Sequence, residues 1–287
     1  MNYKTPAALR MALEQRLKDE DHETGLGLDR LRRRVIFERI VARLHVADPG
    51  CWVLKGGMAL EVRLRDDARF TKDLDLGLRS GLTDVESLTE QVSAALAVDH
   101  FGDGFLLVAE PLVQLEADRA GHVTWRAMVT AQLADRRFGR IQIDLSPRKY
   151  ELDQTDFVAL PNSLAFAGIG SPTIEVIDVH RHAAEKFHGM LRDHGERENS
   201  RVRDLVDIVI LSEHQLLDTT LVAVAVKVVW RERNGANPPA SFPVLPDSWP
   251  DRYERLVGDL QVDAETFPAA VALVTALWLA MFPTQEI

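Results

Sequence analysis

Two carboxylates spaced two residues apart have the chemistry of a metal site. Asp73 and Asp75 alternate with leucine through position 78. This alternation predicts a strand with both carboxylates on one face and a buried apolar face behind them. Two anions this close repel each other, so a cation between them is the expected resolution. The alternative is two solvated aspartates on an edge strand.

A glycine pair precedes this strand. The residues from Cys51 to Leu54 predict a short strand, and Lys55-Gly56-Gly57 follows it at the start of a predicted helix. Glycine lets backbone N–H groups approach a polyanion, and the helix dipole favours negative charge at that end. A phosphate cradle beside a Mg²⁺ clamp, with Mn²⁺ as the alternative ion, predicts phosphoryl or nucleotidyl transfer.

A later hairpin supplies a candidate third carboxylate. Residues 123–133 alternate between apolar and polar, residues 135–139 predict a turn, and Ile141, Ile143 and Leu145 alternate again. Asp144 then lies on the polar face of the second strand. It could bind a second metal ion and take the proton from an attacking hydroxyl. The alternative is an ordinary surface aspartate.

Lys186 and Asp204 are the next candidate pair. Lys186 lies mid-helix beside the apolar Phe187, and Asp204 lies on a later helix. A lysine leaving a partly apolar helix could reach a triphosphate across a cleft, held by a charge-assisted hydrogen bond that it donates to Asp204. The alternative is a structural salt bridge joining two helices. Nearby His180, His182 and His188 lack the second half of a metal site, so surface polarity is favoured for them.

The remaining pattern predicts a chain that begins with helices, continues with strands and ends with helices. Helices are predicted for 6–21 and 28–47, and a capping box at Thr83-x-x-Glu86 predicts another. Residues 105–113 predict a strand. From about Ser171 the pattern turns helical, and Asp178 is predicted to cap a helix there. Proline and glycine gather near 160–172, so the domain boundary is placed there, giving lobes 1–170 and 171–287.

The composition restricts the class of protein. The 287 residues are 46% hydrophobic and 27% charged, which is typical of a globular protein with a real core. A single cysteine, Cys51, excludes an internal disulfide and suits a reducing cytoplasm. We see no N-terminal signal and no apolar run long enough for a membrane. The net charge of −10 argues against bulk capture of nucleic acid. A monomer is expected.

The glycine turn, the helix and the Asp-x-Asp strand resemble the polymerase-β-like nucleotidyltransferases. The runs 55–57, 69–76, 185–188 and 204–207 together resemble the AbiEii/AbiGii toxin family, including its MenT type, over about residues 53–210. The resemblance implies an α/β (α+β) fold with a mixed-sheet N-terminal lobe and a mainly helical C-terminal lobe that closes the nucleotide cleft. It also implies a type IV toxin–antitoxin toxin that transfers nucleotides from an NTP to the 3′ acceptor end of tRNA and so blocks growth.

The resemblance carries roles onto individual residues. Mg²⁺ is expected on Asp73 and Asp75, with Asp144 completing the set, while Lys186 contacts the triphosphate and Asp204 orients it. The residues expected to bind the nucleotide are Lys55, Gly56, Gly57, Arg69, Thr71, Lys72 and Lys186. The expected partners are an NTP, a tRNA or other RNA acceptor and a cognate antitoxin, without a membrane.

This sequence departs from the family pattern at Met58, where relatives often carry Ser or Thr, so a hydroxyl contact to phosphate is missing. The acidic net charge leaves tRNA binding to local cations near the hairpin, and the alternative there is a solvated hairpin end. Those cations are Arg136, Arg137, Arg140, Arg148 and Lys149. Two rival functions stay open: transfer to a small-molecule or protein hydroxyl, and NTP binding without transfer.

Overall fold

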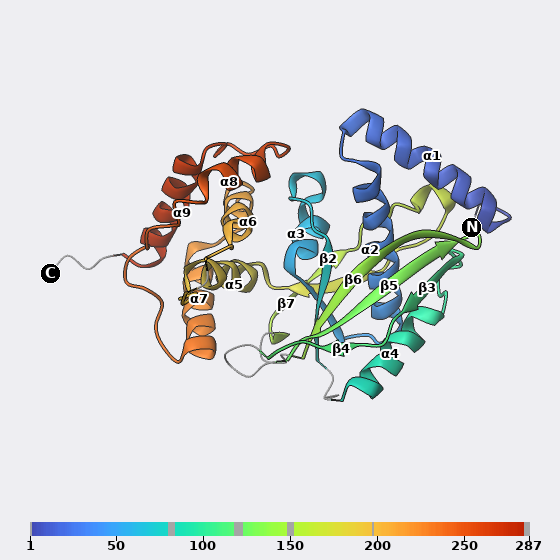
Figure 1. Cartoon of the computed structure of the whole chain (residues 1–287), viewed down its shortest axis with the longest axis horizontal. Coiled ribbons are helices and arrows are strands. Elements are labelled where there is room, and N and C mark those ends of the chain that lie inside the picture. The colour runs from blue at the N-terminus through green and yellow to red at the C-terminus, as the bar shows by residue number, and fades with distance from the viewer. Residues whose placement is uncertain (1, 80–83, 118–122, 148–151, 197, 284–287) are drawn as a thin grey trace. The chain divides into compact units, whose positions relative to one another are not determined.

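The computed structural model describes residues 2–79, 84–117, 123–147, 152–196 and 198–283. The chain divides into two compact units. The sheet unit comprises Met1–Val62 and Phe70–Val176, and the helical unit comprises Arg63–Arg69 and Ile177–Ile287. The short segment Arg63–Arg69 therefore belongs to the helical unit, although it lies early in the chain. Figure 1 labels most of the helices and strands of both units.

A mixed sheet forms the sheet unit (Figure 1). Among the described residues its strands run in the order β3-β5-β6-β2-β1-β8-β7, with β4 paired to β5. The strands are β1 (Trp52–Lys55), β2 (Asp73–Leu78), β3 (Phe105–Ala109), β4 (Val113–Gln114), β5 (Trp125–Leu133), β6 (Arg136–Ser146), β7 (Thr155–Ala159) and β8 (Thr173–Ile177). β2 pairs with β6, and β1 with β8, in parallel; β1–β2 and β5–β6 are antiparallel. The predicted α/β class with a mixed sheet is confirmed.

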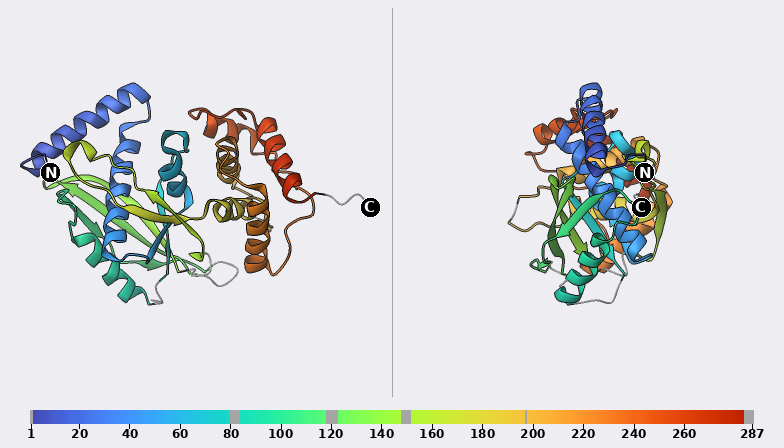
Figure 2. Two further views of the ribbon diagram at one scale, coloured as in Figure 1. Left: turned by 180° about the vertical axis from the view of Figure 1, so that it is seen from behind. Right: turned by 90° about the vertical axis from the view of Figure 1, so that its right-hand side faces the viewer.

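Helices cover the apolar face of this sheet. α2 (Leu28–Ala47) packs on β6 and β1, α1 (Pro6–Thr24) packs on α2, and α4 (Val85–Ala97) packs on β3 and α2. α2 lies behind β5 and β6 in Figure 1 and in front of them in the left view of Figure 2, which is seen from behind. On β5 every second side chain, from Trp125 to Leu133, is buried against these helices. The intervening positions face the other way, so the opposite face of the sheet carries the polar residues.

The β5–β6 hairpin turns earlier than the sequence predicts. The turn residues are Ala134 and Asp135, both with positive φ (53° and 55°), and β6 resumes at Arg136. A two-residue loop with both φ values positive matches the right-handed twist of the flanking strands. Gly139, predicted to lie in the turn, is instead a strand residue whose missing side chain makes room for Ile36 of α2.

Three local predictions need correction. The strand predicted for 105–113 is two strands, β3 and the short β4. The region from Ser171 starts with strand β8, whose Ile174 and Val176 are buried, before the helices begin. Thr83 lies outside the described residues, and the cap of α4 is Asp84, which accepts a hydrogen bond from the Ser87 N–H at 2.7 Å.

The helical unit is a small bundle. It contains α5 (Val179–Leu191), α6 (Val202–Glu213), α7 (Thr219–Asn234), α8 (Pro250–Val257) and α9 (Phe267–Met281). α5 packs on α6 and α7, and α9 packs on α6, α7 and α8. Asp178 caps α5, as predicted, by accepting the Arg181 N–H at 2.7 Å. Trp278 of α9 is fully buried. None of the described helices combines the length and apolar character needed to span a bilayer.

Candidate active site

Four charged side chains form a row across the polar face of the sheet. The strand register places Lys55 opposite Asp75, Asp75 opposite Asp144, and Asp144 opposite Arg126. Side chains at paired positions point to the same side of a sheet. A cation, two carboxylates and a second cation therefore follow one another across β1, β2, β6 and β5. Asp73 lies two residues before Asp75 and on the same face of β2. We call these four side chains together with Asp73 the charged row, and it contains all three predicted carboxylates.

The glycine pair starts a helix directly beside the charged row. α3 (Gly56–Leu64) follows β1 without a loop, and the first N–H groups of a helix have no partner within it. Gly56 has φ +61°, and a Cβ atom there would lie 1.9 Å from Oδ2 of Asp75. Only glycine allows this approach. The start of α3 and the Asp75 carboxylate are therefore in close contact.

Arg126 holds the third carboxylate. Its Nε donates to Oδ1 of Asp144 at 2.8 Å and its Nη2 donates to Oδ2 at 2.7 Å. The hydrogen bonds to Asp144, followed by the charges of Asp144, Asp73 and Asp75, raise the pKa of the Arg126 guanidinium above its usual value. All three carboxylates thus stabilise the positive charge of Arg126. Arg126 was not among the residues predicted from the sequence.

The donor set fits Mg²⁺. Within the described ranges no three Asp, Glu, His or Cys side chains converge as a ready metal-binding group, and both oxygens of Asp144 are directed at Arg126. Carboxylate oxygens are nevertheless the ligands that Mg²⁺ prefers. The raised pKa of Arg126 shows that these carboxylates together attract positive charge. The residues that would hold the ion are Asp73, Asp75 and, once released, Asp144.

A second charged cluster lies inside the helical unit. Nζ of Lys186 lies 2.8 Å from Oδ2 of Asp207 and 3.3 Å from Oδ1 of Asp204. Arg69 also binds Asp207, through Nε to Oδ1 at 2.6 Å and through Nη2 to Oδ2 at 2.8 Å. The Asp207 side chain is fully buried. The predicted Lys186–Asp204 pair exists, but Asp207 is the nearer partner.

In this Lys186 cluster the pKa shifts of Lys186 and Asp207 both favour the charged forms of these two groups. Burial by itself lowers the pKa of Lys186, but Asp207 and Asp204 outweigh it and the pKa lies above its usual value. Burial by itself raises the pKa of Asp207, but Arg69 and Lys186 hold it far below its usual range. Asp207 was missed as a site residue. Its sequence signal was the i, i+3 spacing from Asp204 on an otherwise apolar helix.

Comparison with known families decides the class of protein. A family model described as nucleotidyl transferase AbiEii toxin, type IV TA system, matches residues 39–275. The chain belongs to this family. The matched region includes the charged row, the start of α3 and the Lys186 cluster. This AbiEii protein is therefore a nucleotidyltransferase of the toxin–antitoxin type, as the residue pattern predicts.

Solved structures share the fold. MenT4, the nucleotidyltransferase toxin Rv2826c of Mycobacterium tuberculosis H37Rv, is similar with a TM-score of 0.61 and 18% identity, over 95% of this chain and 90% of that one. JHP933 from Helicobacter pylori gives a TM-score of 0.48 and 17% identity, over 89% of this chain and 93% of that one. At such identities the likeness to MenT4 shows the fold alone. No sequence among curated proteins matches at a significant level.

Two of the predicted nucleotide contacts of the AbiEii chain, Arg69 and Thr71, have partners within the protein. Arg69 lies in the helical unit, buried on Asp207. The hydroxyl of Thr71 donates to the backbone carbonyl of Asp73 at 3.4 Å, which ties the loop to the start of β2. Lys72 is exposed. Arg69 and Thr71 therefore position other groups in this structure, and direct contact with a phosphate remains a prediction for them.

Arginines at the start of α2 have divided roles. Arg32 pairs with Glu14 at 2.6 Å, and Arg34 pairs with Glu61 at 3.0 Å. The guanidinium carbons of Arg30 and Arg33 instead lie 5.6 and 5.8 Å from the centre of the Phe70 ring. Phe70 precedes Asp73 by three residues. A cationic, aromatic patch therefore adjoins the loop that leads into the carboxylate strand.

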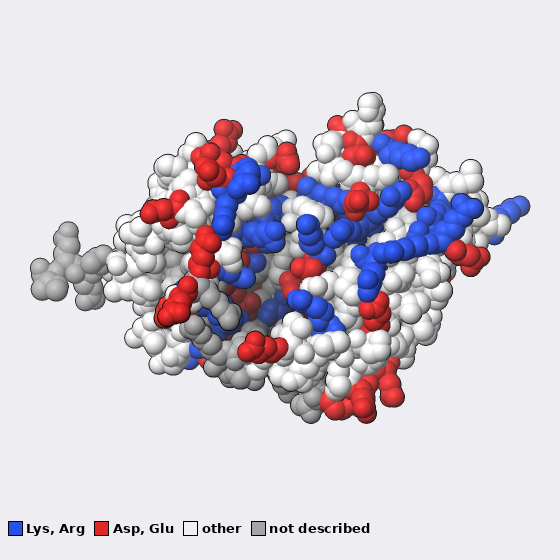
Figure 3. All heavy atoms as spheres, in the orientation of Figure 1, with Lys and Arg blue, Asp and Glu red and all other residues white. Residues whose placement is uncertain are grey.

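The hairpin end is basic, as predicted. Arg136, Arg137 and Arg140 are exposed, with Arg140 paired to Glu110, while 148 and 149 lie outside the described residues. Arg10 of α1 adds a guanidinium by donating to backbone carbonyls of residues 133, 136 and 137 at 2.8, 2.8 and 3.1 Å. Figure 3 shows lysine and arginine side chains gathered in a band over β5, β6 and α2.

Two of the three histidines on α5 are buried, contrary to expectation, whereas His180 is partly exposed and its Nδ1 lies 3.4 Å from Oδ2 of Asp178. His182 and His188 are buried, with exposures of 1% and 4%. A ring nitrogen of His188 lies 2.6 Å from Oδ1 of Asn234, and its ring lies edge-on to Trp230. Burial lowers the pKa of His188 to about 4. These two buried histidines are core residues of the helical unit.

Proposed function

We propose that this AbiEii protein is a Mg²⁺-dependent toxin that transfers nucleotides from an NTP to the 3′ acceptor end of tRNA. The charged row carries the proposal. Asp73, Asp75 and Asp144 lie on neighbouring strands beside a helix start that can receive phosphates, with Gly56 in contact range of Asp75. Nucleotidyl transfer requires carboxylates that bind a metal ion and a helix N-terminus that can receive phosphate groups.

The chain's own groups have distinct tasks in this reaction. When bound, Mg²⁺ would neutralise charge on the phosphates and polarise the attacked phosphorus. The N–H groups at the start of α3 hold phosphate oxygens. Asp144 accepts the proton of the attacking 3′ hydroxyl, a new bond forms from that oxygen to the α-phosphorus, and pyrophosphate leaves. For this step Asp144 must be released by Arg126.

Lys186 is the proposed cation for the triphosphate. Around it the helical unit places three cations (Lys186, Arg69 and Arg201) against two carboxylates (Asp204 and Asp207), since Arg201 binds Asp204 at 2.6 Å. Because Asp207 and Asp204 hold its ammonium, Lys186 is pre-oriented and loses little side-chain freedom on binding.

The proposed RNA acceptor rests on local charge. The chain is acidic, with a net charge of −10, yet cations gather on the polar side of the sheet unit (Figure 3). Arg136, Arg137 and Arg10 at the hairpin end supply phosphate contacts. A cytoplasmic site of action, a monomeric state and a cognate antitoxin complete the proposal, since tRNA is cytoplasmic and the family belongs to type IV toxin–antitoxin systems.

A direct transfer assay tests the proposal. Purified protein is incubated with total bacterial RNA, Mg²⁺ and each labelled NTP in turn, beside Asp73→Ala and Lys186→Ala variants. A labelled band at tRNA size with one or two NTPs, reduced roughly 100-fold or more in both variants, is expected. Omission of the metal should also abolish labelling. No labelled RNA with any NTP would overturn the RNA acceptor and favour a small-molecule or protein hydroxyl.

A further inference from the structure

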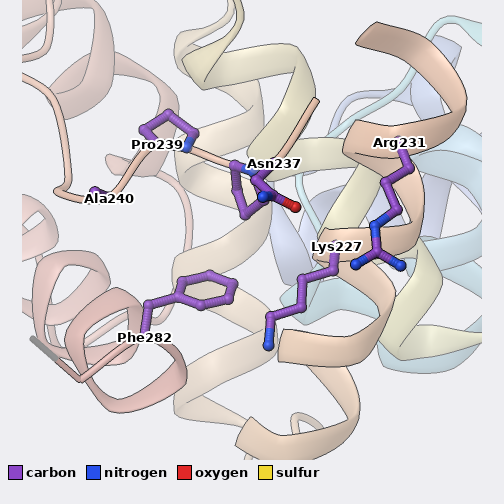
Figure 4. Close-up of a pocket in the computed structure, with 7 residues that line it drawn as sticks. Lys227, Arg231, Asn237, Pro239, Ala240 and Phe282 are labelled. Carbon is purple, nitrogen blue, oxygen red and sulfur yellow. The ribbon is translucent and has the colours of Figure 1, made fainter. Parts of the chain in front are cut away.

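The helical unit contains a cavity that neither the charged row nor the Lys186 cluster uses. Its volume is about 350 Å³, which lies within the range of small-ligand sites. Lys227 and Arg231 of α7 form one wall, the connector residues 237–240 form a second, and Phe282 after α9 forms a third. Figure 4 shows Lys227 and Arg231 extending from the same helix, with Phe282 opposite them.

The two cations of this cavity are available for an anion. Lys227 and Arg231 are exposed and lie one turn apart, so they share a face of α7. Neither has a carboxylate partner within the residues that the structure describes. Arg233, two residues later, differs because it lies 3.5 Å from Glu185. Two uncompensated cations on one cavity wall attract an anionic group such as a phosphate.

The cavity also offers an aromatic ring beside these cations. Nζ of Lys227 lies 5.7 Å from the centre of the Phe282 ring, and that ring packs against Trp278 with 4.9 Å between ring centres. The ring is therefore held in place by a buried side chain. Asn237 lines the same cavity with both a hydrogen-bond donor and an acceptor.

We propose that this cavity binds one nucleotide of an RNA strand. The phosphate is held by Lys227 and Arg231, the base stacks on Phe282, and Asn237 hydrogen-bonds an edge of the base. Stacking on an aromatic ring next to basic side chains is how proteins bind single-stranded nucleic acid with little sequence preference. The inference rests on the proposed function only in taking RNA as the acceptor.

Binding of a short RNA tests the cavity without any need for catalysis. A fluorescein-labelled single-stranded RNA octamer is titrated with the full chain, and unlabelled cytidine 5′-monophosphate is used as competitor. Lys227→Met combined with Arg231→Met should weaken binding about tenfold or more, and Phe282→Leu should weaken it severalfold. The matched control, Arg252→Met combined with Arg255→Met on α8, removes the same charge from the same unit and should bind as wild type.

Each outcome decides the inference. Selective weakening by the cavity variants, with competition by the nucleotide but not by equal inorganic phosphate, supports it. Equal effects of the two double variants, equal competition by phosphate, or no binding of the octamer would overturn it. Nucleotide transfer measured on the same preparations separates the two proposals. If transfer proceeds and the cavity variants bind RNA as the wild type does, only the proposed role of the cavity is refuted. If the cavity variants selectively lose RNA binding but no transfer is detected, only the proposed reaction is refuted.

Discussion

Arg126 donates hydrogen bonds to both carboxylate oxygens of Asp144, at 2.8 and 2.7 Å, across the β5–β6 ladder. Asp144 is in turn the register partner of Asp75 on β2. The positive charge beside Asp144 is therefore supplied by the protein itself, through Arg126. A divalent ion that uses Asp144 must compete with a guanidinium already in a bidentate, charge-assisted pair.

We expect Arg126→Met to strengthen metal binding. Removing the guanidinium frees Asp144 and removes a positive charge near Asp73 and Asp75, so Mn²⁺ should bind about fivefold tighter or more. Electron paramagnetic resonance of free Mn²⁺ during a titration measures this. Arg140→Met is the matched control, because Arg140 lies on the neighbouring strand and pairs with Glu110 instead. Unchanged or weaker Mn²⁺ binding in Arg126→Met would show that Arg126 only positions Asp144.

Substituting Gly56 with alanine should damage the metal site more than the fold. The added Cβ would lie 1.9 Å from Oδ2 of Asp75, so the carboxylate must move, and the left-handed φ costs about 1–2 kcal/mol of stability. Mn²⁺ affinity and nucleotide transfer should both fall at least about tenfold. Gly170→Ala, where nothing lies within 4 Å of the added atom, serves as the control. Equal Mn²⁺ affinity in the two variants would contradict the close approach.

Asp207 should matter more for stability than Asp204. Asp207→Asn leaves Arg69 and Lys186 buried without their main counter-charge, which should cost about 3–5 kcal/mol in the free energy of unfolding. Asp204→Asn leaves Lys186 on Asp207 at 2.8 Å, so its cost should be clearly smaller. Urea unfolding of both variants at neutral pH measures the difference. A larger loss in Asp204→Asn would reverse the order of these two carboxylates.

Glu38 should make the stability of the chain depend on pH. It is fully buried and accepts hydrogen bonds from the Ser163 N–H at 2.7 Å and the Ser163 hydroxyl at 2.9 Å. Burial raises its pKa from 4.5 to about 7, against the opposing effect of Ser163. Its contribution to stability is therefore fully present below pH 4.5 and is lost as the pH rises through 7.

Glu38→Gln should remove this dependence. Between pH 4.5 and 8 the wild type should lose about 3 kcal/mol relative to the Glu38→Gln variant. Urea unfolding at several pH values gives the two profiles. Glu90→Gln, on the exposed side of α4, removes the same charge and should keep the wild-type profile. Parallel profiles for wild type and Glu38→Gln would refute the assignment.

The sequence alone predicted the elements whose pattern is strong and local. The alternation around Asp73 and Asp75, the glycine pair at the start of α3, the helix of residues 28–47 and the Asp178 cap are all found in the structure. Hydrophobic periodicity and capping act over a few residues, so they can be seen without the fold. The ordered set of motifs also sufficed to identify the AbiEii family.

Only the tertiary structure decided which charges meet. Arg126 binds Asp144 across 18 residues of sequence, and Arg69 binds Asp207 across 138. No local pattern encodes such pairs, because strand register and helix packing bring them together. The two-residue turn at Ala134–Asp135, strand β8 and the burial of His182 and His188 were likewise settled by pairing and packing. Residue type fixed what chemistry was possible, and long-range packing selected the partner of each charge.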